Sequence, residues 1–285
     1  MFRPKHRPGT TSSRGLPADY REALKERVIR ARLLTLLLDF DGTLVEITPR
    51  PEEAALETAM KDLLRRLARN PRTRVAIISG RALEDLKAKV GLDECYLAGT
   101  HGLTVEGPTI RFVHPAAARG APAMRVIARR LRMELSSVPG TLVEEKQYSV
   151  ACHYRMVPRP AVAAVKAAAR RIALEGTTRS TTNDSSGWRI LQGKQVLEFI
   201  PQVRWTKGSC AEYLLSHFRS QTPDGGLILP LAAGDDRTDT ELFSAVGKAG
   251  VTFAVDSRAL GADWALRGVP EMRALLEWLH DIVSG

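Results

Sequence analysis

Short apolar runs that end abruptly in polar residues are the feature that most constrains the fold of this chain. LLTLLL (33–38) leads into DFDGT, RVAII (74–78) leads into SGR, and LILPLAA (227–233) leads into GDDRTD. Apolar runs of this length suit strands that are buried on both faces of a parallel sheet. Segments with helical periodicity separate the runs. This alternation predicts an α/β fold with a doubly wound parallel sheet.

The pattern changes in the middle of the chain. Two helical stretches there are each followed by a segment with the pattern of a β-hairpin, TLVEEKQYSVACHYR and WRILQGKQVLEFIP. Helices that alternate with hairpins predict a small α+β layer, not more parallel sheet. We therefore expect a flexible basic tail over residues 1–18, a sheet domain formed by residues 19–114 and 202–285, and an inserted α+β cap over residues 115–201.

The composition narrows the class of partner. The chain has 42 basic and 32 acidic residues and a net charge of +10, which favours an acidic or phosphorylated partner. The basic residues are scattered over helix faces and no nucleic-acid motif is recognisable, so we expect no nucleic-acid partner. The sequence has no apolar run long enough for a membrane span and no signal peptide. The three cysteines are widely spaced and odd in number, a pattern that fits a reduced compartment. We expect a cytoplasmic monomer without a membrane partner.

The acidic residues that follow the apolar runs predict a metal site. The carboxyl ends of parallel strands meet at one edge of the sheet. In an extended chain the carboxylates of Asp39 and Asp41 would point the same way and repel unless a cation lay between them. On the Asp-Gly dipeptide alone, a turn capped by Asp41 is the alternative. Because Mg²⁺ prefers oxygen ligands and keeps several waters, we expect it to bind here and to bridge to a substrate phosphate. The predicted acidic cluster is Asp39, Asp41, Asp235, Asp236 and Asp239.

A lysine begins the helical segment that precedes the third run. Lys207 is the first residue of KGSCAEYLLSHF. A cation at the positive end of a helix is unfavourable by about 0.3 to 1 kcal/mol unless an anion lies beside it. A solvated lysine is the alternative, but the acidic cluster and Ser79 favour a functional role.

Four motifs resemble those of a known superfamily. LLLDFDGTL, VAIISGR, TKG and GDDRTD occur in the order and spacing found in the haloacid dehalogenase (HAD) superfamily of phosphatases. Over residues 33–283 the chain further resembles the trehalose 6-phosphate phosphatase family, through AGTHGL, VEEKQYSVACHYR, GKQVLEFIP, KGSC and GDDRTDTELF. The resemblance implies a magnesium-dependent phosphoric monoester hydrolase of trehalose biosynthesis, which hydrolyses trehalose 6-phosphate through an aspartyl phosphate.

The resemblance also implies a role for each motif residue. Asp39 is the expected nucleophile, and Asp41 the expected proton donor to the departing sugar and activator of water. Ser79 and Lys207 are expected to bind and neutralise the phosphoryl group. Asp39, the backbone carbonyl of Asp41 and Asp235 are the expected metal ligands, with Asp236 and Asp239 acting through water.

The cap is expected to select the sugar. In the resembled family an acid-x-Lys pair and a second acid bind the glucose hydroxyls, which here correspond to Glu144, Lys146 and Glu198. Glu145 is an alternative to Glu144, and exposed hairpin positions without a ligand role are another. Arg81 is expected either to bind phosphate or to orient acidic neighbours. Histidine and arginine positions of the family also match, and they are expected to contact the substrate or to orient the cap: His101, His153 and Arg155.

The chain departs from the family pattern at two positions, and three alternative functions remain to be distinguished. Thr104 and Thr240 stand where the family usually has acids. Thr104 bears on the choice of sugar, because its region is expected to face the cap cleft, and Thr240 bears on the surroundings of the metal, where Glu241 is adjacent. A phosphatase of sucrose phosphate or glucosylglycerol phosphate is the nearest alternative function. A phosphate-responsive receiver module is another, although the inserted cap and the position of TKG before GDD speak against it. A nucleic-acid-binding module is the third.

Overall fold

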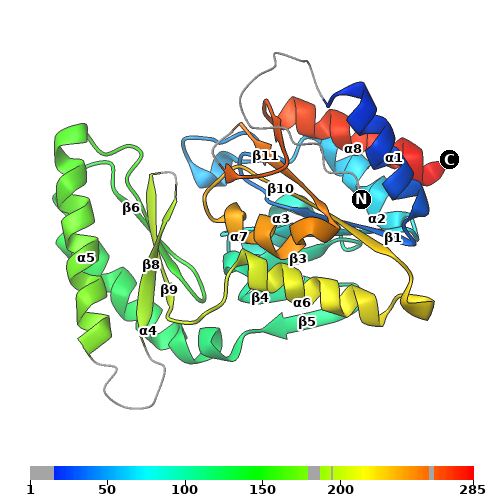
Figure 1. Cartoon of the computed structure of the whole chain (residues 1–285). Helices are drawn as coiled ribbons and strands as arrows, with labels where there is room; N and C mark the ends of the chain where they lie inside the picture. Colours follow the sequence, from blue (N-terminus) through cyan, green and yellow to red (C-terminus); the bar gives the residue numbers. More distant parts are fainter. Residues whose placement is uncertain (1–15, 179–186, 194, 257–259) are drawn as a thin grey trace.

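The computed structural model describes residues 16–178, 187–193, 195–256 and 260–285. Most of the predicted basic tail lies outside these residues. The chain forms two sheets that share no strand, one at each side of the molecule as drawn in Figure 1. No helix in the described ranges is long and apolar enough to cross a membrane.

The larger sheet has eight strands in the order β12-β11-β10-β1-β2-β3-β4-β5. The strands β12 to β3 pair in parallel, and β4 and β5 extend the sheet with antiparallel pairing. The predicted doubly wound α/β fold is therefore confirmed, with an antiparallel edge that the sequence pattern did not predict. The strands are β1 (Leu33–Leu38), β2 (Thr73–Ile78), β3 (Tyr96–Gly99), β4 (Thr104–Gly107), β5 (Ile110–Val113), β10 (Ile228–Gly234), β11 (Val251–Val255) and β12 (Trp264–Leu266).

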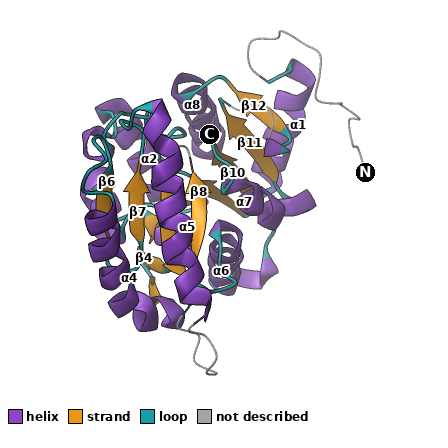
Figure 2. Ribbon diagram, turned by 90° about the vertical axis from the view of Figure 1, so that its left-hand side faces the viewer, coloured by secondary structure: helices purple, strands orange, loops and turns teal. Residues whose placement is uncertain are grey.

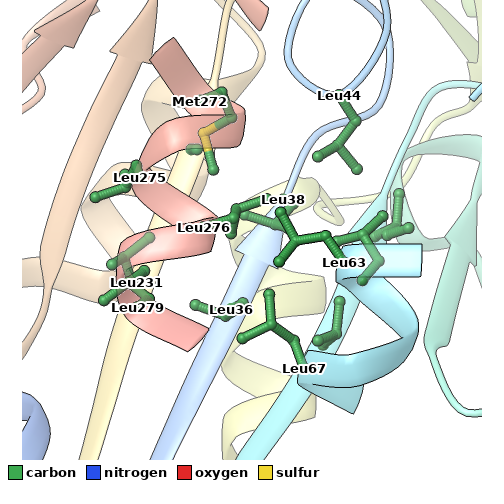
Figure 3. Close-up of a cluster of buried hydrophobic side chains, with 14 of the residues drawn as sticks. Leu36, Leu38, Leu44, Leu63, Leu67, Leu231, Met272, Leu275, Leu276 and Leu279 are labelled. Atoms are coloured by element: carbon green, nitrogen blue, oxygen red, sulfur yellow. The ribbon is translucent and has the colours of Figure 1, made fainter. Parts of the chain in front are cut away.

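Helices cover both faces of this sheet. One face packs against α1 (Ala18–Arg30), α2 (Thr58–Arg69), α3 (Leu83–Val90) and α8 (Val269–Ser284), and the other against α6 (Lys207–Ser220) and α7 (Asp239–Val246). Alternate residues of β1 serve the two layers: Leu36 contributes to the first and Leu37 to the second. In Figure 3, Leu36 and Leu38 lie between the leucines of α2 and those of α8. The acidic motif therefore follows a strand that is fixed from both sides.

The smaller sheet is antiparallel, in the order β6-β7-β9-β8. Its strands are β6 (Leu142–Glu145), β7 (Val150–His153), β8 (Trp188–Gly193) and β9 (Val196–Pro201), and its helices are α4 (Pro115–Glu134) and α5 (Val162–Thr178). Both helices pack on the sheet face that points away from the larger domain (Figures 1 and 2). The opposite face, which carries Glu144 and Glu198, is directed at the larger sheet. Short 3₁₀ turns complete the described elements: η1 (Pro51–Glu53), η2 (Thr100–Gly102), η3 (Arg159–Ala161), η4 (Pro223–Gly225) and η5 (Gly247–Ala249).

Candidate active site

Three neighbouring strands bring the motif residues together. β1 lies between β10 and β2, and Asp39, Asp235 and Ser79 follow the last residues of these strands. All three side chains are buried and line one cleft of about 620 Å³ between the two sheets. The structure therefore brings these three residues together at the carboxyl edge of the sheet, as the sequence predicted.

Lys207 connects the acidic residues of two motifs. Its Nζ donates to Oδ1 of Asp39 and to Oδ1 of Asp239, at 2.6 Å in each case. The Thr206 side chain caps α6 and accepts a hydrogen bond from the backbone of Ser209. Burial alone would lower the pKa of Lys207, but the charges of Asp239 and Asp39 outweigh this and raise the pKa. These anions explain why a buried lysine is tolerated at the start of a helix.

The acidic cluster carries more negative charge than Lys207 balances. One carboxylate oxygen from each of Asp39, Asp235 and Asp239 lies within 4.8 Å of the others. Burial raises the pKa of Asp39 well above its ordinary value; Lys207 opposes the shift, and Asp239 and Asp235 reinforce it. A hard cation with oxygen ligands would relieve this repulsion. The oxygens of Asp39 and Asp235, with Asp239 beside them, therefore fit a divalent ion such as Mg²⁺.

Asp239 and Asp236 are held by different hydrogen bonds. Asp239 accepts hydrogen bonds from Lys207 through Oδ1 and from the backbone N–H groups of Asp235 and Asp236 through Oδ2. These bonds occupy both oxygens, which suits a supporting position better than a direct metal ligand. Asp236 accepts from the backbone of Arg237 and also lines the cleft.

The carboxylate of Asp41 lies outside the three-residue cluster. Arg81 binds it with two hydrogen bonds of 2.7 Å, from Nε and from Nη2. The backbone bends at Phe40, between the two acids, and turns again at Gly42, which has a φ of +84° and donates its N–H to the backbone oxygen of Val45. The extended geometry expected from the sequence, with both carboxylates side by side, is therefore replaced by a turn that directs Asp41 towards Arg81.

The cap contributes a second polar group of residues to the cleft. Glu198 accepts from Lys146 at 3.0 Å and from Ser149 at 2.7 Å, and it hydrogen-bonds to His101 at 2.8 Å. Burial alone would raise the pKa of Glu198, but Lys146, His101 and Ser149 hold it well below its ordinary value. Lys146 also donates to the backbone oxygen of Gly80 at 2.8 Å. Lys146 and Glu198 thus join the cap to the larger domain as well as lining the cleft.

The structure distinguishes the two candidate acids of β6. Glu144 lines the cleft and hydrogen-bonds to His153 at 2.9 Å. Glu145 lies on the opposite side of the strand, where it pairs with Arg132 of α4 at 3.0 Å. Arg155 also lines the cleft and donates to the backbone oxygen of Thr48. Glu144, not Glu145, is therefore placed to meet a ligand.

The two departures from the family pattern lie outside the residues that line the cleft. The hydroxyl of Thr104 donates to the backbone oxygen of Gly99 within the sheet, and that of Thr240 donates to the backbone oxygen of Arg237. Each threonine thus satisfies its hydroxyl locally.

Three polar partners were not predicted from the sequence. Thr43 donates to Oδ2 of Asp39 at 3.3 Å, Ser149 binds Glu198, and Asp85 binds Arg81 at 2.7 Å. Thr43 stands inside the DFDGT motif and could have been selected on that basis. Ser149 and Asp85 have no distinguishing pattern around them.

Gly42 offers a direct test of how closely the cluster is packed. A Cβ at this position would lie 2.2 Å from Oδ2 of Asp235. We expect Gly42→Ala to displace Asp235 and to reduce the phosphatase activity that the motif resemblance implies by about 100-fold, since a displacement near 1 Å can cost that much. Gly261→Ala is the matched control, because Gly261 also has positive φ but has no neighbour within 4 Å of the added Cβ. Equal activity of the two variants in a phosphate-release assay would contradict the expected role of Asp235.

The sheet order, the inserted antiparallel cap and the acid–lysine cluster at the carboxyl edge define an HAD-like hydrolase fold. A haloacid dehalogenase-like hydrolase from B. subtilis has the same fold, with a TM-score of 0.51 and 13% identity, over 85% of this chain and 98% of that one. The C-terminal domain of C. albicans trehalose-6-phosphate phosphatase is more similar, with a TM-score of 0.73 and 21% identity, over 93% of this chain and 97% of that one.

The sequence comparisons narrow this class to one family. The trehalose-phosphatase family profile matches residues 37–263. Trehalose-phosphate phosphatase from Mycobacterium tuberculosis H37Rv is 35% identical over 228 residues, which are 79% of this chain and 54% of that protein. The chain belongs to the trehalose-phosphatase family, which confirms the resemblance identified from the sequence motifs. It spans about half the length of the curated relatives it matches.

Proposed function

We propose that this chain hydrolyses trehalose 6-phosphate to trehalose and inorganic phosphate, with Mg²⁺ as its cofactor. The observation that carries the proposal is the contact of Lys207 with Asp39 and Asp239, beside Asp235 in a cleft shared with the cap. Membership of the trehalose-phosphatase family and the curated relatives support the choice of substrate.

In the proposed reaction, Asp39 is the nucleophile. An oxygen of Asp39 attacks phosphorus, the bond from phosphorus to the sugar oxygen breaks, and an aspartyl phosphate forms. Asp41 gives a proton to the departing sugar oxygen and then takes one from the water that hydrolyses the phosphoenzyme. Ser79 donates a hydrogen bond to the phosphoryl oxygens and Lys207 neutralises their charge.

Mg²⁺ would be held by Asp39, the backbone carbonyl of Asp41 and Asp235, with Asp236 and Asp239 acting through water, and it would supply positive charge to the phosphoryl oxygens. The fit rests on the donor atoms of the acidic cluster. Lys207 is buried beside these carboxylates and offsets part of their mutual repulsion before a substrate binds.

On the cap side, Glu144, Lys146 and Glu198 recognise the sugar. Carboxylates accept hydrogen bonds from hydroxyl groups and a lysine donates to them, which is suitable chemistry for a polyol. Because Lys146 and Glu198 also bind Gly80 and His101, they position the cap as well. The hydrogen bond of Glu144 to His153, by contrast, stays within the cap.

The proposed function is tested by measuring phosphate release from a panel of sugar phosphates in the presence of Mg²⁺. We expect the highest kcat/KM on trehalose 6-phosphate, with trehalose identified as the product by chromatography. Sucrose phosphate and glucosylglycerol phosphate are the comparison substrates. A higher kcat/KM on either of them, or no phosphate release from trehalose 6-phosphate, would contradict the proposal.

The role of the cap is tested with Glu144→Ala. Loss of a charged hydrogen-bond partner costs about 1.5 to 3 kcal/mol, so we expect kcat/KM on trehalose 6-phosphate to fall roughly 10- to 100-fold. The loss on para-nitrophenyl phosphate should be much smaller, because that substrate has no sugar. Glu145→Ala is the matched control, since Glu145 is adjacent but pairs with Arg132 outside the cleft. Similar losses on both substrates would indicate a structural role for Glu144.

A further inference from the structure

We propose that Asp85 is a positioning residue, which holds Arg81 so that Arg81 fixes the carboxylate of Asp41. The inference rests on the proposed function, because it takes Asp41 as the proton donor. It also assigns Arg81 to the orientation of acidic neighbours and not to phosphate binding, the two roles that the sequence left open.

The guanidinium of Arg81 is almost fully engaged. Nε and Nη2 donate to the two oxygens of Asp41, Nη1 donates to Asp85, and Nη2 also donates to the backbone oxygen of Pro51 at 2.9 Å. The guanidinium lies 5.4 Å from the centre of the Phe40 ring. Because an arginine has five N–H donors, four such bonds leave little capacity for a phosphate. A bidentate pair also fixes the plane of the carboxylate, not only its distance.

Asp85 is the acid that fixes the other end of Arg81. It lies in the first turn of α3, and its Oδ1 is 3.9 Å from Nζ of Lys89. Lys89 in turn donates to the backbone oxygens of Glu52 and Ala54. Arg81 and Lys89 therefore anchor the segment 51–54 beside Asp41, and Asp85 lies between the two cations. Asp85 is not among the residues that line the cleft, so its effect on the reaction passes through Arg81.

This arrangement predicts a defect that depends on the leaving group. In the first step the Asp39–phosphorus bond forms and the phosphorus–oxygen bond to the leaving group breaks. For this step Asp41 carries a proton on one oxygen while Arg81 keeps its hydrogen bond to the other. Asp41 gives that proton to the leaving oxygen and becomes the carboxylate that Arg81 binds with two hydrogen bonds. A sugar alkoxide needs that proton, whereas para-nitrophenolate is a stable anion and leaves without it. A misplaced Asp41 should therefore lower kcat/KM for a sugar phosphate more than for para-nitrophenyl phosphate. A residue that only supports the fold, or an arginine that binds phosphate, would affect both substrates alike.

The test compares Asp85→Ala and Asp85→Asn with the unaltered protein on both substrates. For Asp85→Ala we expect kcat/KM on trehalose 6-phosphate to fall about 10- to 100-fold, and kcat/KM on para-nitrophenyl phosphate to fall by less than about threefold. Asp85→Asn keeps an acceptor oxygen for Arg81 and should recover part of the loss. Glu84→Ala is the matched control, because the Glu84 side chain is adjacent on α3 and 78% exposed; its kinetics should match those of the unaltered protein.

Two outcomes would overturn the inference: equal losses on the two substrates, or no loss on either in Asp85→Ala. The unaltered protein is measured first, so that failure of the proposed function is recognised separately. If it hydrolyses another sugar phosphate but not trehalose 6-phosphate, the proposed substrate is wrong, and the same comparison with that sugar phosphate still decides the role of Asp85. If it hydrolyses no sugar phosphate at all, the proposed function fails and the inference fails with it.

Discussion

Asp39→Asn is expected to reduce the hydrolysis of trehalose 6-phosphate by roughly 10⁴-fold or more, because an amide cannot act as the nucleophile. The substitution preserves the size of the side chain. It also removes one negative charge from a cluster in which burial and two neighbouring acids already raise the pKa of Asp39. We therefore expect the Tm of the variant to be equal to or higher than that of the unaltered protein, as measured by calorimetry.

Asp62→Asn is a suitable control for Asp39→Asn, because Asp62 is an exposed acid of α2 that pairs with Arg65 on the surface. Its activity and Tm should match those of the unaltered protein. If Asp39→Asn kept near-normal rates, the phosphoenzyme mechanism would have to be abandoned. A large fall in Tm together with lost activity would instead mean that Asp39 is needed for folding.

Removal of the metal is expected to have the second large effect. In EDTA we expect turnover to fall to background, because three carboxylates within 4.8 Å are balanced only in part by Lys207 and the phosphoryl group adds further negative charge. Added Mg²⁺ should restore the rate. Ca²⁺ should not, because its larger and looser ligand shell would misplace the attacking carboxylate.

The metal prediction is checked by titrating the EDTA-treated protein with each ion and measuring phosphate release. Full turnover in EDTA, or equal rates with Ca²⁺ and Mg²⁺, would be incompatible with the proposed magnesium site. Thermal unfolding of the same samples provides a second readout. Mg²⁺ should raise the Tm of the unaltered protein and raise that of Asp39→Asn less, since a ligand stabilises only the state it binds.

The parallel part of the fold could be predicted because three of its strands, β1, β2 and β10, are largely apolar. Leu36 and Leu38 face one helical layer and Leu37 the other, so a strand buried on both faces is visible in the residue types alone. The antiparallel edge was not predicted. β4 and β5 are short and follow a turn in which Thr100 and His101 both have positive φ. Threonine and histidine rarely adopt this conformation, so the turn could not be predicted from the residue types.

Asp39 and Asp235 of the acidic cluster could be predicted because each follows directly on a strand, and Asp239 because it belongs to the same acidic motif as Asp235. The orientation of Asp41 could not, since it depends on a bend at Phe40 and on Arg81, which comes from the loop between β2 and α3. The contact of Asp85 with Arg81 could not be predicted from the sequence either. Asp85 is one of two adjacent acids at the start of α3, and only the folded chain distinguishes it from Glu84, which remains exposed.

The cap residues were predicted by family resemblance, and the structure adds contacts that the resemblance did not provide. Glu144 and Glu145 are neighbours in the sequence, but successive residues of a strand point to opposite faces. The residues of β6 that pair with β7 are therefore divided between the cleft and α4. The contact of Lys146 with Gly80 joins segments far apart in the chain. Side-chain chemistry alone does not predict that contact.

Rapid-quench labelling tests most directly the central claim, that Asp39 accepts the phosphoryl group of trehalose 6-phosphate. The unaltered protein and Asp39→Asn are mixed with trehalose 6-phosphate labelled in its phosphate, in the presence of Mg²⁺, and quenched in acid over the first turnovers. Peptide mass spectrometry then locates the label. The account predicts transient label on Asp39 of the unaltered protein, appearing before inorganic phosphate, and none in the variant. Label on a different residue, or phosphate release by Asp39→Asn at the normal rate, would contradict it.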